Sequence, residues 1–242
     1  MYYRNITEEI RLRQEVFQQE KMAAIGMLAG GVAHEVNNPL GGVLAFTQLL
    51  LQRVKSEDPV YEDLKEIESA AIRCKKIIQD LLDFSRVSGD KEKSQVDVNV
   101  LLEKVVPFVR MELRSLNVDL KLNLDKQIQK IEGAPDRLQQ VFLNLMTNAC
   151  HAMPKGGALA LTTKKVSEGV EIEIKDNGAG IPKENLHRIF EPFFTTKKPG
   201  KGTGLGLAIS YRIIQDHGGR MEVESEVNRG TTFTLFLPAT RE

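Results

Sequence analysis

The chain has 242 residues, a length that suits two domains and allows at least one sizeable hydrophobic core. Its 33 basic and 33 acidic residues balance, so no overall charge attracts it to nucleic acid or to an anionic membrane. Cys74 and Cys150 have neither metal-site spacing nor a disulfide framework, as is typical of a cytoplasmic protein. The longest apolar run, residues 22–33, is shorter than the roughly 20 residues that span a bilayer. We therefore expect a cytoplasmic chain, free or part of a membrane-anchored protein, that makes no membrane contact itself.

Apolar positions at steps of three, four and seven predict helices in the first third of the chain. Residues 6–28 carry a weak coiled-coil seam, and we assign residues 1–20 to a coiled-coil linker. Residues 40–54 continue the spacing up to a polar turn at residues 55–59, and residues 64–85 repeat it most regularly. Two such helices joined by a short turn form an antiparallel hairpin.

This hairpin, assigned to residues 21–88, is expected to dimerise. Leu44, Leu49 and Leu51 lie off the apolar seam of its first helix and present more apolar surface than one partner helix can cover. A homodimeric four-helix bundle would cover that surface. Packing of the same residues against the C-terminal domain is the alternative.

The remainder of the chain mixes strands and helices. Residues 88–94 are charged and contain glycine, which indicates a linker ahead of a domain at residues 95–242. We expect strands near residues 96–98, 118–124, 158–166, 170–175, 221–225 and 231–237, and helices near residues 100–114, 136–149 and 205–216. Helices together with strands of antiparallel type predict a two-layer α/β sandwich, so the whole chain is of the α+β class.

The first candidate site is the run HEVNNPL at residues 34–40. On a helix His34 and Asn38 share a face, and Glu35 lies three residues before Asn38, so three functional side chains form one patch. Pro39 lacks an N–H for the carbonyl of Glu35 and is expected to kink the helix there. Most helical histidines have no catalytic role, so this motif is informative only together with the others.

The second candidate site is a polar stripe on the helix expected at residues 136–149. Gln140, Asn144, Asn148 and His151 follow one another at steps of four, four and three. Asparagine is a poor helix former, so its presence requires a reason. The stripe is either a solvated face or a set of carbonyl oxygens that ligate a hard cation such as Mg²⁺ beside phosphates.

The third candidate site is DNGAGI at residues 176–181, directly after an expected strand. An Asn-Gly pair in this place is typical of a hairpin turn, which is the simplest interpretation. A second glycine followed by Ile-Pro fits a two-residue turn poorly. Asp176 at a strand end, with glycines that let a planar ring approach the backbone, would instead suit the amino group of adenine.

The fourth candidate site is GTGLGL at residues 202–207, at the start of an expected helix. Glycine-rich loops in this position expose backbone N–H groups to phosphate, and the helix N-terminus adds positive potential. The run matches neither the Walker A pattern nor the dinucleotide-binding pattern. Lys197, Lys198 and Lys201 precede it as a basic lid, or alternatively as a solvated run of charge.

These segments, in order and together with FEPFF at residues 190–194, resemble the signature boxes of two-component histidine kinases. HEVNNPL resembles the H box, NLMTNA the N box, DNGAGI the D box, FEPFF the F box and GTGLGL the G box. The match covers about residues 20–240. The opening residues resemble the helix that leaves a PAS sensor domain, which implies that residues 1–20 are a linker from a missing sensor region and that the chain is free in the cytoplasm or the cytosolic part of a membrane-anchored sensor. The resemblance implies a dimerisation and histidine-phosphotransfer hairpin followed by an ATP-binding domain with the Bergerat fold.

The same resemblance implies roles for individual residues. His34 would attack the γ-phosphate of ATP with Glu35 as acid/base partner, and the phosphoryl group would pass to an aspartate of a response-regulator receiver domain. Asn38 would align water on the phosphorylated regulator, so that the protein would also be a phosphatase. Asn148 would ligate Mg²⁺, and Asp176 would bind the adenine amino group. The other implied ATP-binding residues are Asn144, His151, Gly178, Gly180, Ile181, Phe190, Lys197, Gly202, Thr203, Gly204, Leu205 and Gly206.

One departure from the family's pattern is His151, which stands where a lysine is often found. Two other functions are compatible with parts of the sequence. A non-kinase ATPase of the same nucleotide-binding superfamily would share the N, D and G boxes but would lack HEVNNPL. A pseudokinase scaffold would dimerise and bind a regulator without chemistry, although every expected catalytic box is filled here.

Overall fold

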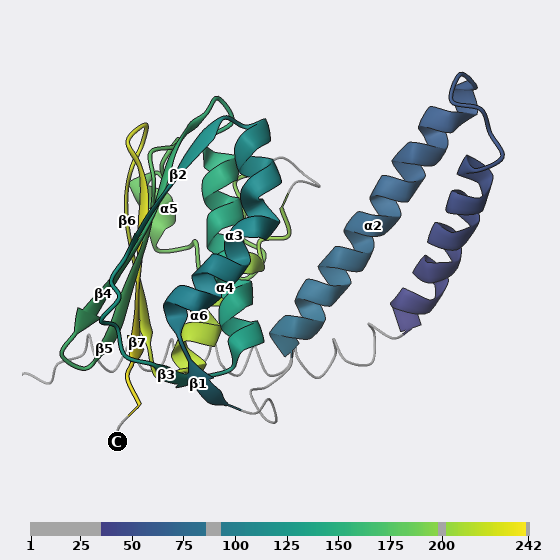
Figure 1. The fold of residues 1–242 in the computed structure, drawn as a ribbon. Coiled ribbons are helices and arrows are strands. Elements are labelled where there is room, and N and C mark those ends of the chain that lie inside the picture. The colour runs from purple at the N-terminus through teal and green to yellow at the C-terminus, as the bar shows by residue number, and fades with distance from the viewer. Residues whose placement is uncertain (1–34, 86–92, 198–201, 241–242) are drawn as a thin grey trace, which may run out of the picture. The chain divides into compact units, whose positions relative to one another are not determined.

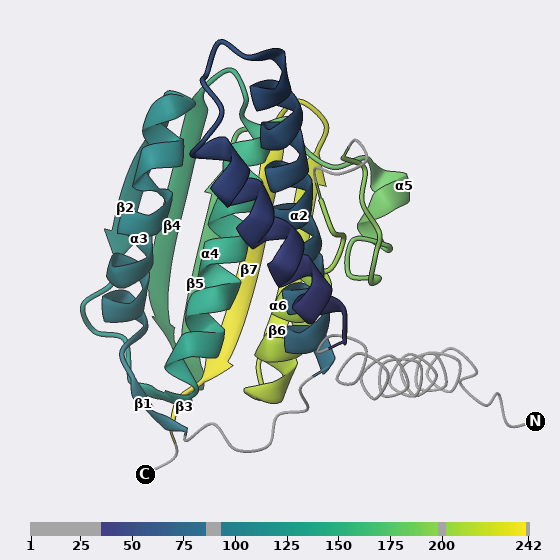
Figure 2. The same ribbon diagram turned by 90° about the vertical axis from the view of Figure 1, so that its right-hand side faces the viewer.

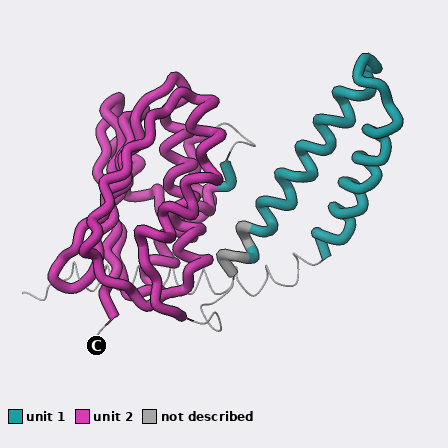
Figure 3. The backbone as a smooth tube through the Cα atoms, in the orientation of Figure 1, with its two compact units in different colours: residues 1–89, 198–203 teal, residues 90–197, 204–242 magenta. Residues whose placement is uncertain are grey.

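The computed structural model describes residues 35–85, 93–197 and 202–240. The chain divides into two compact units, one comprising residues 1–89 with 198–203 and the other residues 90–197 with 204–242 (Figure 3). Within the described residues, no helix is both long and apolar enough to cross a membrane. His34, Lys198 and Lys201 lie outside the described residues.

Residues 35–85 of the first unit form a helical hairpin. One helix includes residues 35–51 and continues through Pro39 without a break, turns follow at residues 52–58, and helix α2 spans Pro59–Ser85. The two helices lie side by side and run in opposite directions (Figure 1). The carboxylate of Asp58 accepts a hydrogen bond of 2.9 Å from the backbone N–H of Val60, which satisfies one exposed donor at the start of α2. The polar turn therefore ends one helix and starts the next, as the sequence predicts.

A single hairpin leaves many apolar side chains in contact with solvent. Among the described side chains of α2, only Leu64 and Ala71 are buried. Phe46, on the first helix, is 71% exposed. The other exposed apolar side chains of the hairpin are Val36, Val43, Leu49, Leu50, Val60, Ile67, Ile72 and Ile77. A surface of this kind, on both helices of the hairpin, is typical of an interface with another chain.

The second unit is a sheet covered on one face by helices (Figures 1 and 2). Its strands lie in the order β2-β4-β5-β7-β6, where β2 pairs with β4 in parallel and the other neighbours are antiparallel. Two shorter strands, β1 and β3, form a separate antiparallel pair. The strands are β1 Ser94–Val96, β2 Val118–Leu124, β3 Ile131–Gly133, β4 Gly157–Val166, β5 Gly169–Asp176, β6 Arg220–Glu226 and β7 Gly230–Pro238. The helices are α3 Val98–Ser115, α4 Pro135–Ala152, α5 Lys183–Leu186 and α6 Gly206–Asp216.

The core lies between the sheet and the helices α3, α4 and α6. Alternate residues of the central strands point into it, such as Leu159 and Leu161 of β4 and Ile172 and Ile174 of β5, which are all buried. From the helical side Phe142 and its apolar neighbours on α4 complete the packing. This alternation confirms the two-layer sandwich that the sequence predicts, and it leaves the polar side of α4 available for another role.

Two expectations about this unit are wrong. The strand expected at residues 96–98 ends at Val96, because the Asp97 carboxylate accepts hydrogen bonds from the N–H groups of Asn99 and Val100 and so starts α3. The strands are also not all antiparallel, because the chain returns through α4 before β4 pairs with β2 in parallel. The strand β3 and the helix α5 were not anticipated.

His217, just beyond α6, holds the start of α4. Its Nε2 accepts a hydrogen bond of 3.0 Å from the N–H of Ala134, and its Nδ1 lies 2.6 Å from the carbonyl oxygen of Ile213, to which it donates. Ala134 is the N-cap of α4 and has no side chain that could cap the helix. The imidazole therefore supplies the missing cap from a distant part of the sequence, in its neutral form with the proton on Nδ1.

We expect His217→Ala to lower the free energy of unfolding of the sandwich unit by about 1–3 kcal/mol, because it leaves the Ala134 N–H and the Ile213 carbonyl without partners. Urea denaturation followed by circular dichroism would measure the change. The exposed histidine His187 provides the control, since His187→Ala removes the same group from the surface. Equal stability of the two variants would contradict this role for His217.

Candidate functional site

Asn144, in the polar stripe of α4, contacts α6 and orients Asn148. The amide nitrogen of Asn144 donates a hydrogen bond of 2.8 Å to the hydroxyl of Ser210, and the amide nitrogen of Asn148 lies 3.4 Å from the amide oxygen of Asn144. A Cβ atom at Gly206 would overlap that same Asn144 oxygen, so the first residue of α6 must be glycine for the helix to approach. The stripe is therefore not simply a solvated face, because two of its members orient each other against α6.

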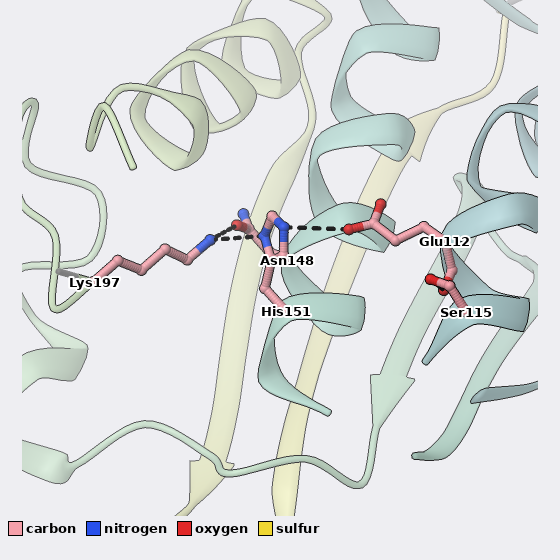
Figure 4. A network of polar contacts seen from close by, with 5 residues as sticks. All are labelled: Glu112, Ser115, Asn148, His151 and Lys197. Atoms are coloured by element: carbon pink, nitrogen blue, oxygen red, sulfur yellow. Dashed lines mark hydrogen bonds and ion pairs between the residues drawn. The ribbon is translucent and has the colours of Figure 1, made fainter. Parts of the chain in front are cut away.

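The amide oxygen of Asn148 points away from this cluster toward a lysine. The ammonium of Lys197 lies 3.1 Å from Asn148 Oδ1 and 3.0 Å from His151 Nδ1 (Figure 4). On the other side of the ring, His151 Nε2 lies 3.2 Å from a carboxylate oxygen of Glu112 in α3. Sequence reasoning missed Glu112, since it belongs to no motif and resembles any surface glutamate on an amphipathic helix.

Asp176, the last residue of β5, is a buried carboxylate, 6% exposed. Its Oδ1 accepts hydrogen bonds from the backbone N–H groups of Gly178, at 2.8 Å, and Thr231, at 3.2 Å. Its Oδ2 has no hydrogen-bond partner in the part of the chain that the structure describes. Burial raises the pKa of Asp176, and the two backbone hydrogen bonds oppose that shift. The residue thus presents one acceptor oxygen to a ligand.

The loop after Asp176 is not a hairpin turn. The side chain of Asn177 accepts a hydrogen bond of 2.7 Å from the N–H of Ala158, which ties the loop to the start of β4. Gly180 has a φ of 70° and its Cα packs against the backbone of Glu226, where a side chain would overlap. The Ile181 N–H donates to the hydroxyl of Ser225 at 2.8 Å. Because the loop is bound to several elements, the hairpin interpretation of Asn177-Gly178 is wrong.

Thr231 and Ser225 complete the support beneath Asp176. The hydroxyls of Thr231 and Ser225 lie 2.9 Å apart, and the Ser225 hydroxyl also donates to the carbonyl of Gly230. Thr231 is buried, and its backbone N–H is one of the two donors to Asp176. Sequence reasoning placed Thr231 in a strand but gave it no role, because only the pairing of β7 with β5 brings it beside the carboxylate.

A backbone hydrogen bond joins Gly204 of the glycine-rich loop to Phe193. The Phe193 N–H donates to the carbonyl of Gly204 at 3.0 Å, with φ values of 66° and 68° at these two residues. A side chain at Gly204 would overlap the Phe193 backbone. Two residues later α6 starts at Gly206, and the ring of Phe190 lies 4.9 Å from that of Tyr211 in this helix. The hydrogen bond between Phe193 and Gly204 therefore fixes the position of the backbone just before the N-terminus of α6.

Together these features suit a ligand with an amino-bearing ring at one end and an anionic group at the other. Asp176 offers an acceptor to the ring. The N-terminus of α6 lies against Asn144, and Lys197 lies against Asn148, so positive potential gathers beside the α4 amides. The described residues contain no cluster of three or more His, Cys, Asp or Glu side chains for a metal. An amide oxygen such as that of Asn148 suits Mg²⁺, which commonly takes few protein ligands and completes its shell with phosphates.

The candidate residues of the hairpin are only partly described. Glu35 and Asn38 are both exposed on the helix through residues 35–51. His34, the candidate nucleophile, precedes the described residues.

Leu205 of the glycine-rich loop is fully buried at the N-cap of α6, so it supports the loop by packing. Gly202 and Thr203 immediately precede Gly204 in the chain.

Two protein-family models match the chain. The His Kinase A (phospho-acceptor) domain matches residues 24–89, and the histidine kinase-, DNA gyrase B-, and HSP90-like ATPase matches residues 133–241. The chain is 38% identical to sensor kinase CckA of Brucella abortus (strain 2308), an alignment that covers 96% of this chain and 26% of CckA. The chain thus spans about a quarter of that relative's length.

Solved structures show the same relationship. Full-length ShkA in complex with AMPPNP is 26% identical with a TM-score of 0.76, over 89% of this chain and 47% of ShkA. The catalytic domain of histidine kinase ThkA is 34% identical with a TM-score of 0.57, over 62% of this chain and 100% of that domain. ThkA in complex with response regulator protein TrrA is 26% identical with a TM-score of 0.67, over 98% of this chain and 68% of that one.

The match to the phospho-acceptor domain separates the chain from ATPases that share only the nucleotide-binding fold. Helical hairpin and sandwich occur here in the order found in these kinases, each with its own family match. The chain therefore belongs to the histidine kinases of two-component systems, of which it forms a catalytic core.

Proposed function

We propose that this chain phosphorylates itself on His34 with Mg²⁺-ATP and passes the phosphoryl group to an aspartate of a response-regulator receiver domain. One observation carries the proposal: the sandwich combines a buried carboxylate that has an uncommitted oxygen with an asparagine pair oriented against the N-terminus of α6. These are the groups that a purine and its phosphates require.

Asp176 selects the base. Its Oδ2 accepts a hydrogen bond from the adenine amino group, while Oδ1 stays bound to the backbone N–H groups of Gly178 and Thr231. Guanine carries a carbonyl oxygen at the corresponding position, which would face the carboxylate as a second acceptor. The site therefore favours ATP over GTP, because a buried acceptor that faces another acceptor is costly.

The α4 amides and the loop before α6 hold the phosphates. Asn148 Oδ1 would ligate Mg²⁺, and the Lys197 ammonium would then give up its hydrogen bond to that oxygen for the phosphates while it stays bound to His151 Nδ1. Asn144 orients Asn148 from the turn before. Lys197 and His151 stand beside Asn148 Oδ1, while Gly202, Thr203, Gly204 and Gly206 present the loop backbone to the phosphates. Mg²⁺ held there would supply positive charge to neutralise the β- and γ-phosphates.

His34 is the acceptor. A ring nitrogen of the neutral imidazole attacks the γ-phosphorus, a P–N bond forms, and the bond from phosphorus to the β,γ-bridging oxygen breaks to release ADP. Glu35 takes the proton from the imidazole. Adjacent residues on a helix do not face each other, so Glu35 reaches the ring along its flexible stem. The exposure of Glu35 in the hairpin is compatible with that role.

Two partners are proposed, a second copy of this chain and a response-regulator receiver domain. The exposed apolar side chains of the hairpin support a homodimer, in which four helices would cover them. ThkA, to which this chain is similar, has been solved in complex with response regulator protein TrrA. We propose an equivalent receiver-domain partner here, in the cytoplasm.

Incubation of the chain with γ-labelled ATP and Mg²⁺ tests the kinase activity. We expect stoichiometric label that is lost in acid and stable in base, since phosphohistidine has this chemistry. The pseudokinase alternative predicts no label. Label that survives acid would indicate a hydroxyl acceptor and would contradict the proposal.

Asn38 supports a second activity, dephosphorylation of the regulator. Its amide is exposed, and Asn38 follows His34 by four residues in the sequence, a spacing that on a helix would place both on one face, where Asn38 would align water on a docked phosphoaspartate. We expect Asn38→Ala to retain autophosphorylation and to slow loss of phosphate from the phosphorylated receiver domain by about tenfold or more. The control is Gln52→Ala, which removes an exposed amide just beyond the other end of the same helix. Dephosphorylation at the wild-type rate in Asn38→Ala would exclude the role.

A further inference from the structure

A line of polar contacts runs from α3 across α4 to Lys197 (Figure 4). It joins the Glu112 carboxylate to His151 Nε2 at 3.2 Å, His151 Nδ1 to the Lys197 ammonium at 3.0 Å, and that ammonium to Asn148 Oδ1 at 3.1 Å. Glu112 lies outside all five signature boxes. Asn148 and His151 are one turn apart on α4, so Lys197 is bound at two points of the same helix.

The two neighbours of His151 require the same tautomer. A carboxylate can only accept a hydrogen bond, so the proton facing Glu112 is on Nε2. An ammonium can only donate, so Nδ1 must present its lone pair to Lys197. Glu112 therefore selects the form of the imidazole that can hold the lysine. A ring with the proton on Nδ1 would turn a donor toward the ammonium and release it.

The charge of Glu112 acts at this end of α4. Burial raises the pKa of Cys150, the residue before His151, to about 11, and the Glu112 carboxylate adds to the increase. The backbone of α3 at this point is secured by Ser115, whose hydroxyl donates to the Glu112 carbonyl at 2.9 Å (Figure 4). Glu112 is thus a charged group on an ordered helix, placed to act on the imidazole.

We propose that Glu112 is a positioning residue for nucleotide binding, which orients His151 so that the Lys197 ammonium is held beside Asn148, where the phosphates bind. The inference rests on the proposed function and adds a residue from α3 to the site. A lysine side chain loses rotamer entropy when it is fixed, so holding it in place before the nucleotide arrives raises affinity. A lysine at position 151 would need no such partner, because it has no tautomer to select.

Titration with a fluorescent ATP analogue and Mg²⁺ tests the inference on the whole chain. We expect Glu112→Ala to raise the Kd about fivefold, as for loss of one partly exposed charged hydrogen bond. Glu112→Gln should bind almost as tightly as the wild type, because its amide oxygen can also accept from Nε2–H. The control is Glu103→Ala, which removes an exposed carboxylate from the same helix and should leave the Kd unchanged.

A double variant separates positioning from general loss of charge. In the His151→Ala background, Glu112→Ala should have no further effect on the Kd, because its action passes through the ring. Additive effects would contradict the proposal. Failure of the wild type to bind the analogue would instead overturn the proposed function, whereas binding that Glu112→Ala leaves unchanged would overturn this inference alone.

Nitrogen-15 NMR of the histidine rings gives a direct structural test. The His151 resonances, assigned by their loss in His151→Gln, should show the proton on Nε2 in the nucleotide-free wild type. In Glu112→Ala the ring should shift toward a mixture of tautomers. A wild-type ring with the proton on Nδ1, or a tautomer unaffected by Glu112→Ala, would contradict the proposal.

Discussion

Replacing His34 with glutamine is expected to reduce transfer of label from γ-labelled ATP to the chain by at least about a thousandfold, since an amide cannot replace the imidazole as nucleophile. Binding of the ATP analogue should remain within about twofold of the wild type, because His34 does not belong to the nucleotide site proposed in the sandwich. Autoradiography after electrophoresis under neutral or alkaline conditions measures the label, and fluorescence titration measures the binding.

The control for His34→Gln is His187→Gln, the same exchange at an exposed histidine of the sandwich. This variant should accept label like the wild type. Label that persists in His34→Gln would show that another residue accepts the phosphoryl group. Loss of analogue binding in His34→Gln would show that the variant is damaged beyond its nucleophile.

Asp176→Asn is expected to abolish nucleotide binding, with affinity for the ATP analogue at least about a hundredfold lower. Asparagine has the same shape, and its amide oxygen can still accept from the N–H groups of Gly178 and Thr231. Its NH₂ group, however, replaces Oδ2 and turns a donor toward the amino group of adenine. Wild-type affinity in Asp176→Asn would exclude this residue from base recognition.

The same variant should not be less stable than the wild type. Burial raises the pKa of Asp176, so between its ordinary value of 3.8 and the raised value the folded chain binds more protons than the unfolded chain. The free energy of unfolding of the wild type therefore falls as pH rises through this window. Asparagine has no charge to bury, so Asp176→Asn should equal or exceed the wild type at pH 7, and the difference should shrink as pH is lowered through the window.

Asp125 provides a control, because its pKa is shifted in the opposite direction to that of Asp176. Backbone hydrogen bonds from Gln127 and Lys165 lower its pKa, so its contribution to stability is present above its ordinary pKa of 3.8 and is lost as pH falls through the lowered value. Asp125→Asn should therefore be less stable than the wild type at pH 7. Urea denaturation at several pH values measures both variants, and parallel pH profiles for them would contradict the assignment.

Much of the fold follows from local patterns. Strand β2 has the predicted bounds Val118–Leu124, and α4 and α6 lie within a few residues of their expected limits. The apolar side chains of α4 lie on one buried face, at the regular spacing that makes a long helix a strong local signal. The strand β3 was missed because three residues carry no periodicity. The parallel pairing of β2 with β4 was missed because alternation within a strand does not specify its neighbour.

The site was predictable where a residue carries its chemistry in a motif. Asp176, Asn144 and Asn148 were selected as candidates in this way, and the contacts of Asn144 and Asn148 give a reason for asparagine inside a helix. Thr231 and Glu112 were not identified, because each acts through a neighbour that is distant in the sequence. Asn177 was ambiguous, since its side chain makes a long-range hydrogen bond that a local turn rule cannot anticipate.

Mapping the phosphoryl group tests the central claim most directly. The chain is incubated with Mg²⁺-ATP, digested at neutral or mildly alkaline pH, and the peptides are fragmented in the mass spectrometer. Of the four histidines, His34 alone should carry phosphate, and His151, His187 and His217 should be unmodified. Phosphate on one of those three, or on a serine, threonine or tyrosine in place of His34, would contradict the account.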